Sequence, residues 1–221
     1  MPRVLITGFG RFPGVAENPS SWLAQTLAGR SPPEFHGDLH VRVLPTEWQA
    51  TTLMPDLYAT LQPTLMIHFG LNQRAKSLRI ERSAHNRIGA RPDACGALPL
   101  GPVIHANGPD RIDTAVPVWA LAAHLRRLGL PATASPSAGS YLCNFLYYHS
   151  LAWAHRNRCR ALFVHIPPVG SGNPISERAV LRAAQEILRF MLDVTPARAR
   201  GRDSADPFVA PTEVTMTAKE A

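Results

Sequence analysis

The sequence predicts an α/β protein built on a sheet with parallel strands that carries helices on its faces. Two observations predict this class. Short apolar runs such as residues 64–70 have the length and composition of buried strands, and they alternate with longer segments of helical apolar spacing. A strand, helix, strand order of this kind places helices on the faces of the sheet. Functional groups in such sheets gather in loops beyond the carboxyl ends of the strands.

The elements of the first third of the chain follow this order. A glycine turn ends the first strand, and the Asn18-Pro19-Ser20-Ser21 stretch is typical of a helix cap. A helix break is expected at Met54-Pro55, because proline removes an internal hydrogen bond. The expected elements are a strand at residues 3–8, a helix at 22–27, a strand at 41–45, a helix at 48–61 and a strand at 64–70.

Two irregular segments follow the third strand. Residues 71–79 are polar and basic, and residues 88–109 are rich in Gly and Pro and contain Cys95, so both are expected to be loops. A loop as long as the second is usually functional or disordered. The elements expected after it are a helix at 116–128 closed by Gly129, a strand at 132–135, a helix at 145–155, a strand from 160 that brings His165 to its end, and an amphipathic helix at 177–192.

Length and cysteine content limit the class of protein. The 221 residues, 45% of them hydrophobic, suffice for one domain with a sizeable core, which we place at residues 1–194. Residues 195–221 are rich in Pro, Ala, Arg and acidic residues, which predicts a flexible surface tail. Three cysteines without a targeting segment predict a reducing compartment, the cytoplasm, rather than a disulfide framework. No apolar run is long enough to cross a membrane, so no membrane partner is expected.

The formal net charge of +7 is compatible with a polyanionic partner. The basic excess is nearly all arginine and is scattered along the chain, with no zinc-finger spacing and no aromatic RNA-binding signature beside it. We therefore expect a solvated arginine-rich surface and no nucleic-acid partner. A basic binding protein that uses its arginines on nucleic acid stays open as an alternative from a different functional class.

The stretch of residues 137–144, Ser-Ala-Gly-Ser-Tyr-Leu-Cys-Asn, is the strongest candidate for chemistry. Small residues lead into Cys143, and a helical segment follows it. Gly139 permits backbone angles that other residues resist. Cys143 is therefore expected near a helix N-terminus, where unpaired N–H groups and the helix dipole favour a thiolate and could bind a developing oxyanion. The alternative is a buried structural cysteine.

Two further groups complete a candidate catalytic set. His165 ends a buried strand, and Glu81 lies in a polar segment before the long loop. A histidine can hold a cysteine as thiolate near neutral pH and then protonate a leaving amine, and a glutamate can fix the tautomer of that histidine. The alternatives are a core cysteine, a histidine bonded to backbone, and a glutamate paired with Arg79 or Arg82. No cluster has the spacing of metal ligands, so no metal is expected.

The candidate residues lie in short stretches that occur in the order Glu, Cys, His, and further short stretches accompany them. These stretches are Thr7-Gly8-Phe9, Asn18-Pro19-Ser20, Val43-Leu44-Pro45, Arg79-Ile80-Glu81-Arg82, Gly101-Pro102, the segment 137–144 and Val164-His165-Ile166-Pro167. Each stretch alone is a modest signal, but several in register are specific. Together they resemble the pyroglutamyl peptidase type I family, also called pyrrolidone-carboxylate peptidases, through most of residues 3–192.

The resemblance implies a three-layer α/β/α sandwich with a mixed, largely parallel central sheet. It also implies a cysteine exopeptidase that removes an N-terminal pyroglutamyl residue from peptides, needs no metal or cofactor, and forms homo-oligomers, tetramers by analogy with bacterial members. By resemblance, Cys143 is the nucleophile, His165 the general base and acid, and Glu81 the acid that orients the histidine. Arg91 matches the family arginine near the oxyanion site.

The resemblance further implies a pocket for the pyrrolidone ring. Phe9 and Phe12 match the two aromatics that flank the ring, and Asn18 matches the asparagine of the Asn-Pro motif. A small neutral lactam has two flat faces and a polar edge, which aromatic walls and a few backbone groups can bind. The alternative for both phenylalanines is ordinary core packing.

Three departures from the family pattern concern the loops around this pocket. Pro13 stands in place of a glycine, the segment 71–76 is bulkier and more basic than usual, and Gly89 stands where an acidic residue is common. These departures leave the Cys-His-Glu set unchanged. A diverged amidohydrolase that uses the same three groups on another acyl group therefore stays open as a second alternative.

Overall fold

Strands and helices follow one another along the chain from Arg3 to Asp193, with one run of two helices and one run of four strands. The structure is a computed structural model that describes residues 1–193, so the tail expected at residues 195–221 lies outside the described residues. None of the described helices has the length and apolarity needed to cross a lipid bilayer. In chain order the elements are β1 (Arg3–Phe9), α1 (Pro19–Gly29), β2 (Asp38–Leu44), α2 (Trp48–Thr52), α3 (Met54–Leu61), β3 (Leu65–Leu71), β4 (Leu78–Glu81), β5 (Ser83–His85), β6 (Arg111–Asp113), α4 (Val118–Arg127), β7 (Ala132–Ser135), α5 (Leu142–Arg156), β8 (Arg160–Ile166) and α6 (Glu177–Asp193).

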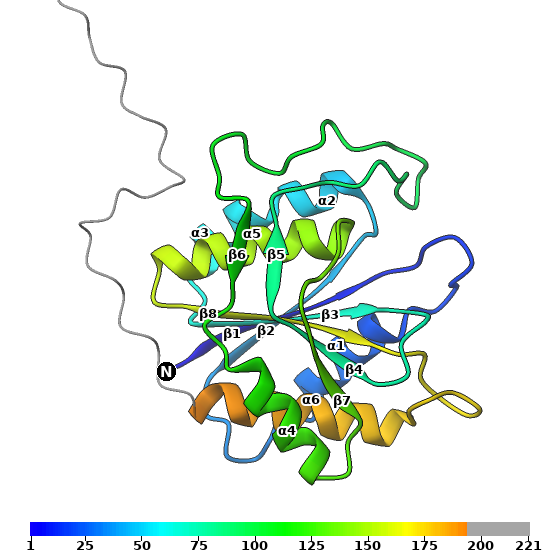
Figure 1. Cartoon of the computed structure of the whole chain (residues 1–221). Coiled ribbons are helices and arrows are strands. Elements are labelled where there is room, and N and C mark those ends of the chain that lie inside the picture. The colour runs from blue at the N-terminus through cyan, green and yellow to red at the C-terminus, as the bar shows by residue number, and fades with distance from the viewer. Residues whose placement is uncertain (194–221) are drawn as a thin grey trace, which may run out of the picture.

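The central sheet is mixed and largely parallel. Six strands lie in the order β2-β1-β3-β8-β4-β7, and neighbouring strands are parallel except for β4 and β8, which are antiparallel. A separate antiparallel ribbon is formed by β5 and β6. Helices α2, α3 and α5 cover one face of the sheet, and α1, α4 and α6 cover the other (Figure 1). The structure confirms the expected three-layer α/β/α sandwich.

The two faces of the sheet bury separate apolar clusters, and the period of two along each strand decides which side chain joins which cluster. Val4 and Ile6 of β1 pack on the side of α1, α4 and α6, whereas Leu5 packs on the side of α3 and α5. Because both faces are covered, the central strands contain continuous apolar runs. Phe163 of β8 also packs on the α5 side, so His165, two positions further on, faces α5 as well.

Three short strands and several strand ends differ from the sequence prediction. β4, β5 and β6 were not predicted, and residues 78–79 belong to β4 rather than to a loop. Strand β3 continues to Leu71, the first residue of the loop that the sequence predicts at residues 71–79. Strands of three or four residues that carry charged side chains give almost no periodic signal, so pairing with distant strands decides their conformation.

Local capping chemistry sets the helix boundaries. The Asn18 side chain accepts a hydrogen bond of 3.1 Å from the Ser20 N–H and caps α1, as the Asn-Pro-Ser-Ser stretch predicted. The predicted break near Pro55 is confirmed, because α2 and α3 are separate helices. Helix α5 begins at Leu142 rather than at residue 145, so Cys143 lies within its first turn.

A chain of buried hydrogen bonds crosses the α5 side of the sheet. His68 of β3 is fully buried, with Nδ1 2.8 Å from Thr7 Oγ1 and Nε2 2.8 Å from Ser150 Oγ of α5. Ser150 Oγ lies 2.7 Å from the Tyr58 hydroxyl of α3 and donates to the Leu146 carbonyl at 2.8 Å. Burial lowers the pKa of His68 to about 3, so its ring is neutral.

Counting donors assigns the protons in this chain. The hydroxyl proton of Ser150 goes to a backbone carbonyl, so Ser150 Oγ accepts hydrogen bonds from both the Tyr58 hydroxyl and His68 Nε2–H. The remaining ring nitrogen of His68 then accepts the hydroxyl proton of Thr7. With all of these groups paired, the chain fixes α5 and α3 against β1 and β3 at no desolvation cost.

Replacing Ser150 by alanine should lower the free energy of unfolding by about 1–3 kcal/mol, because His68 and Tyr58 then lose their buried acceptor. Urea unfolding followed by circular dichroism measures the change. Ser77→Ala is the matched control: its hydroxyl makes a long 3.4 Å contact with Thr133 near the surface, and its loss should cost less than about 0.5 kcal/mol. Equal unfolding midpoints for the two variants would show that the buried chain does not stabilise the fold.

Candidate active site

Two of the candidate catalytic side chains meet where β4 and β8 run antiparallel. His165 and Glu81 are separated by 84 positions in the chain, yet His165 Nδ1 lies 2.8 Å from Glu81 Oε1. Both side chains are buried, at 8% and 0% exposure. Ile80 packs on the opposite face with α4 and α6, so the alternation of β4 turns Glu81 toward α5. The antiparallel neighbour therefore supplies a carboxylate to the ring of His165.

Cys143 reaches the same place from the first turn of α5. Its Sγ lies against Gly70, the β3 residue in register with His165. A Cβ at Gly70 would lie 3.1 Å from that sulfur and 2.8 Å from the Phe163 ring, so only glycine allows the thiol to come so close to the strands. Cys143 is partly exposed, which leaves the sulfur accessible to a substrate.

The charge state of His165 follows from its two partners. Burial alone lowers the pKa of an imidazole. The electrostatic interaction and the hydrogen bond with the Cys143 side chain, together with the hydrogen bond and the charge of Glu81, outweigh burial and raise the pKa of His165 to about 9. The ring is therefore protonated at neutral pH. A protonated histidine between a cysteine and a glutamate is the arrangement that a thiolate–imidazolium mechanism requires.

Glu81 has a second cationic neighbour. Arg79 Nε lies 3.5 Å from Glu81 Oε1, whereas Arg82 pairs with Asp113 at 2.9 Å. The pair of Glu81 with Arg79, which the sequence left open as an alternative, thus exists beside the pair with His165. Two cations offset part of the cost of burying the carboxylate, since an unpaired buried charge is strongly destabilising.

The other two cysteines have surroundings that disfavour a thiolate. Cys95 is exposed and donates to Glu47 Oε1 at 3.4 Å, and this hydrogen bond and the nearby negative charge raise the pKa of its thiol. Burial raises the pKa of Cys159 to about 12. Within residues 1–193, no three His, Cys, Asp or Glu side chains are grouped as ligands for a metal ion.

The start of α5 is shaped by the backbone rather than by a capping side chain. Tyr141 takes the N-cap position with an extended conformation and no side-chain capping bond, and Gly139 before it has a φ of +90°. The first hydrogen bond inside the helix runs from the Phe145 N–H to the Tyr141 carbonyl at 3.0 Å. The N–H groups of residues 142–144 precede that bond and lack a helical partner. They are suited to bind negative charge on a thiolate or an oxyanion.

Asn144, next to Cys143, is a position that the sequence pattern did not single out. Its fully buried amide accepts from the His85 N–H at 2.8 Å and donates to the carbonyls of His85 and Arg87 at 2.8 and 3.0 Å. These bonds attach the segment after β4 to the start of α5. One signal in the sequence could have identified Asn144: it is an amide side chain in an apolar helical segment, and a buried amide needs hydrogen-bond partners.

Two other side chains that the sequence pattern did not single out organise the long loop at residues 88–109. As predicted, this loop contains neither helix nor strand. Asn86 accepts from two backbone N–H groups and donates to two carbonyls of residues 104–108, and so joins the two ends of the loop. Asp93, 7% exposed, accepts from three backbone N–H groups, including that of Trp48 at the start of α2. The loop is therefore fixed to the helices around Cys143.

Arg91 of this loop lies beside the start of α5. Its guanidinium is 4.7 Å from the centre of the Tyr141 ring, over the ring face. The Tyr141 hydroxyl donates to the Pro92 carbonyl at 2.9 Å, and the Trp48 ring meets the Tyr141 ring edge-on at 5.2 Å. The structure thus places an exposed cation close to the turn that carries Cys143, held there by an aromatic pair.

Phe9 and Phe12 occupy different surroundings. Phe9, the last residue of β1, is 3% exposed and packs against Phe163 with ring centres 6.5 Å apart. Phe12 lies in the following loop, is half-buried and belongs to neither apolar cluster. Core packing therefore accounts for Phe9 and does not account for Phe12. Contact of either ring with a substrate stays a prediction.

The loop that holds Phe12 closes in a tight turn. Phe12 and Val15 exchange backbone hydrogen bonds of 2.8 and 3.3 Å, and Gly14 has a φ of +81°. Proline at the first central position and a left-handed glycine at the second are the preferred residues of a type II turn. The departure at Pro13 is therefore compatible with a fixed turn, because that position donates no hydrogen bond.

Asn18 attaches this loop to α1. Besides the capping bond, its Oδ1 accepts from Ser20 Oγ at 2.8 Å and its Nδ2 donates to the Gly10 carbonyl at 3.0 Å. The side chain is 4% exposed and lies beneath the loop. In the structure Asn18 positions the segment that carries Phe12, and its predicted contact with substrate stays a prediction.

The other two places that depart from the family pattern, the segment 71–76 and Gly89, are also hydrogen-bonded to elements of the site. In the segment 71–76, the Asn72 N–H donates to the Ile166 carbonyl at the end of β8, at 2.9 Å. The Gly89 N–H donates to the Ser140 carbonyl at 2.7 Å, and a Cβ at Gly89 would lie 2.9 Å from Ser140 Oγ. Both segments are thus bonded to the elements that carry the histidine and the cysteine.

Comparison with known proteins shows the family of this chain. A family model described as pyroglutamyl peptidase matches residues 2–178. Pyroglutamyl-peptidase 1 of Rattus norvegicus is 35% identical over 194 residues, which cover 86% of this chain and 90% of the relative. Pyrrolidone-carboxylate peptidase of Chromobacterium violaceum is 38% identical over 171 residues, which cover 76% of this chain and 78% of the relative.

Solved structures lead to the same family. Pyrrolidone carboxyl peptidase from Thermococcus litoralis matches with a TM-score of 0.78 and 29% identity, covering 90% of this chain and 99% of that chain. The enzyme from Fervidobacterium islandicum matches with a TM-score of 0.79 and 31% identity, covering 87% and 99%. Both likenesses extend over the sheet and the helices that carry the site. The chain belongs to the pyroglutamyl peptidase family.

Proposed function

We propose that this chain is a cysteine exopeptidase that hydrolyses the bond after an N-terminal pyroglutamyl residue of a peptide. The observation that carries the proposal is the row formed by Glu81, His165 and Cys143, with the sulfur at a helix start. This row supplies an orienting carboxylate, a proton carrier and a nucleophile for one acyl-transfer reaction. Relatives over most of the chain are named for this activity.

The reaction proceeds in two halves. The Cys143 thiolate attacks the carbonyl carbon of the scissile amide and forms a C–S bond, while the N–H groups at the start of α5 bind the oxyanion. The His165 imidazolium then protonates the departing amine, the C–N bond breaks, and a thioester is left. Water attacks the thioester, His165 takes its proton, and pyroglutamate leaves as the thiolate reforms. Glu81 holds the His165 ring through Nδ1 in both halves.

The remaining predicted residues take supporting roles in this proposal. Phe12, which packs in neither core cluster, stacks on a face of the lactam, and Phe9 supports that wall from the core. Asn18 holds the loop of Phe12 in place. Arg91, stacked on Tyr141, adds positive charge near the oxyanion.

We also propose a cytoplasmic, homo-oligomeric enzyme with one catalytic domain over residues 1–194. The nucleophile must stay a free thiol, which a reducing compartment favours. Three apolar side chains of the long loop, Leu98, Leu100 and Val103, are exposed, which is typical of an association surface. A tetramer follows by analogy with the family.

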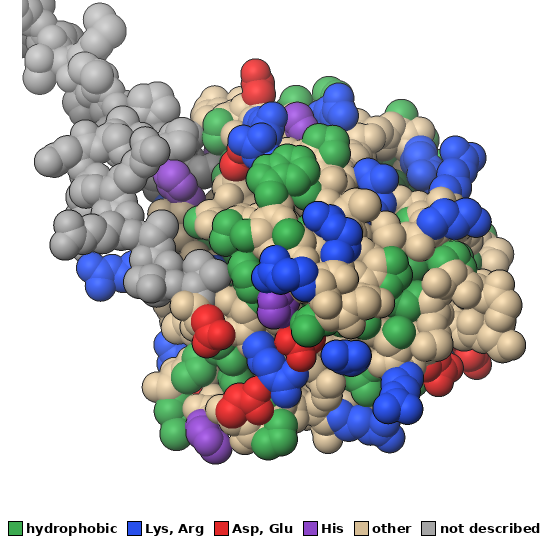
Figure 2. Space-filling view, turned by 60° about the horizontal axis from the view of Figure 1, so that its bottom comes forward, with side chains coloured by type: hydrophobic (Ala, Val, Ile, Leu, Met, Phe, Trp, Pro, Cys, Tyr) green, Lys and Arg blue, Asp and Glu red, His purple; other side chains and the backbone are tan. Residues whose placement is uncertain are grey.

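No nucleic-acid partner is proposed. On the face that Figure 2 shows, the Lys and Arg side chains lie in separate groups among hydrophobic and other side chains rather than in one stripe. Two of the arginines in the sheet region, Arg79 and Arg82, are paired with carboxylates. This distribution supports a solvated arginine-rich surface.

Turnover of a pyroglutamyl anilide beside a prolyl anilide tests the proposed function. The wild-type protein should release the amine from the pyroglutamyl compound, and Cys143→Ala should release none, because the acyl group then has no acceptor. Cys95→Ser is the matched control and should keep full activity, since Cys95 is an exposed thiol paired with Glu47. Full activity in Cys143→Ala would refute the mechanism, and faster turnover of the prolyl compound would favour a diverged amidohydrolase.

The pH profile of kcat/KM tests the role of His165. The protonated ring gives the proton to the leaving amine, so activity should be present below its raised pKa of about 9 and be lost as the pH rises through that value. Glu81→Gln removes a negative group that helps to raise this pKa, so the alkaline limb should move to lower pH. Glu34→Gln, which removes an exposed carboxylate paired with Arg189, should not move it. An alkaline limb unchanged in Glu81→Gln would contradict the proposed pairing.

Alanine variants of the two phenylalanines should separate binding from packing. Phe12→Ala should lower kcat/KM by about 5- to 150-fold, because a loss of about 1–3 kcal/mol is expected when one aromatic face is no longer buried against the substrate. Phe9→Ala should mainly lower the free energy of unfolding, by about 3–5 kcal/mol, because it leaves a cavity beside Phe163. Melting temperature and kcat/KM are measured on both. A large stability loss with normal kcat/KM in Phe12→Ala would show that this ring is structural.

A further inference from the structure

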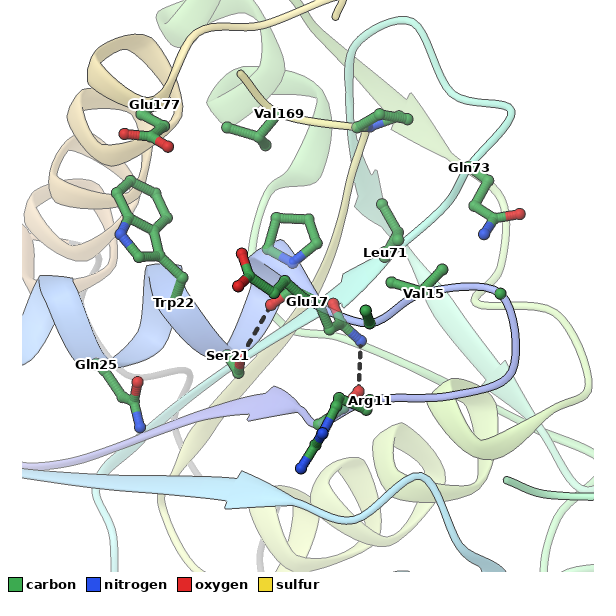
Figure 3. A pocket seen from close by; sticks show the side chains of 16 residues that line it. Arg11, Val15, Glu17, Ser21, Trp22, Gln25, Leu71, Gln73, Val169 and Glu177 are labelled. Carbon is green, nitrogen blue, oxygen red and sulfur yellow. Dashed lines mark hydrogen bonds between the residues drawn. The ribbon is translucent and has the colours of Figure 1, made fainter. Parts of the chain in front are cut away.

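A large groove lies at the same edge of the sheet as the catalytic row but on the side of α1 and α6 (Figure 3). Its volume is about 1090 Å³, and neither Cys143 nor His165 lines it. Three of the segments around it follow the parallel strands β1, β3 and β8, and the N-terminal parts of α1 and α6 complete it. Asn18, which holds the loop of Phe12, is among its lining residues, but the proposed reaction places no part of the substrate in the groove.

The walls of the groove combine apolar and charged side chains. Trp22 of α1, Leu71 and Val169 provide apolar surface from three different segments (Figure 3). The lining residues include two carboxylates, those of Glu17 and Glu177, and a single guanidinium, that of Arg11. Such a lining suits an extended chain with apolar side chains and, on balance, a basic rather than an acidic one.

The groove and the catalytic row lie on the two sides of the same strand ends. Gly70 contacts Cys143, and the next residue, Leu71, lines the groove. Successive side chains of a strand point to opposite faces, and successive Cα atoms are about 3.8 Å apart. The sulfur and the groove therefore lie on opposite sides of the end of β3. The end of β8 lies between them as well, since His165 faces α5 whereas Pro168 and Val169, which follow β8, line the groove.

We infer that this groove binds the part of the substrate peptide that follows the pyroglutamyl residue. The inference rests on the proposed peptidase activity and adds a substrate class to it: peptides with several residues beyond the scissile bond, apolar or basic rather than acidic. The pyroglutamyl group lies on the α5 side of the strand ends, and the departing chain passes over Leu71 into the groove. The volume lies just above the range of about 300–1,000 Å³ for pockets that bind drug-sized ligands.

Two substrates of different length test the inference. The wild-type protein and Trp22→Ala are assayed for kcat/KM on a pyroglutamyl anilide and on a pyroglutamyl pentapeptide with apolar residues, with release of the amine or of pyroglutamate as readout. The ratio of the pentapeptide value to the anilide value should fall about tenfold in Trp22→Ala, as expected for loss of one aromatic anchor. Trp119→Ala, a change in an exposed tryptophan of α4 outside the groove, should leave the ratio at the wild-type value.

A charge variant keeps the inference testable if Trp22→Ala does not fold. Glu177→Gln removes an exposed carboxylate from the groove and should lower the preference for a pentapeptide with arginine over one with glutamate by about threefold. Asp56→Asn is the matched control, because Asp56 is also an exposed acid in the first turn of a helix, α3, outside the groove. It should leave the preference unchanged.

The outcomes separate the two proposals. The wild-type protein can turn over the anilide while Trp22→Ala keeps the pentapeptide-to-anilide ratio and Glu177→Gln keeps the preference for arginine over glutamate. That result overturns the groove assignment and leaves the peptidase proposal standing. Absence of anilide turnover in the wild-type protein overturns both. A Trp22→Ala variant that dissociates in sedimentation while its substrate ratio stays constant identifies the groove as an interface between copies of this chain, which also overturns the assignment.

Discussion

The buried hydrogen bond between His165 and Glu81 is the interaction on which the site depends. A carboxylate with no exposed surface must be paired, and here an imidazolium and Arg79 pair it. That pairing requires an acidic side chain beside the end of β8, facing α5. The antiparallel insertion of β4 between β8 and β7 provides it. The departure from parallel pairing in this sheet thus has a chemical consequence: it places the orienting acid.

The position of the sulfur depends on how α5 docks on the sheet. Gly70 lets the first turn of the helix come into contact with β3, and Asn144 bonds that turn to the segment after β4. Further along α5, Ser150 meets His68 and closes the buried hydrogen-bond chain. These contacts hold the helix at both ends of its buried stretch, so the thiolate and the imidazolium stay in register.

The strand ends divide the substrate into two parts. The charge pair lies on the α5 side, and the loop of Phe12, which also borders the groove, is proposed to bind a small neutral ring. The α1 and α6 side has the groove with Trp22 and two carboxylates, which suits a chain. Because Gly70 contacts the sulfur and the next residue, Leu71, lines the groove, one peptide that passes over the end of β3 can occupy both parts with its scissile amide at the sulfur.

Local patterns in the sequence were enough to predict the strand–helix order, the break near Pro55, Cys143 at a helix start and His165 at a strand end, because apolar periodicity and caps depend on near neighbours. The resemblance to a family added the role of Glu81. Only the tertiary structure decided that Glu81 lies on a short antiparallel strand and that the Cys143 sulfur lies against Gly70. It also decided which segments enclose the groove beside α1 and α6. Strand pairing and the partners of buried polar groups join residues far apart in the chain, and no local period encodes them.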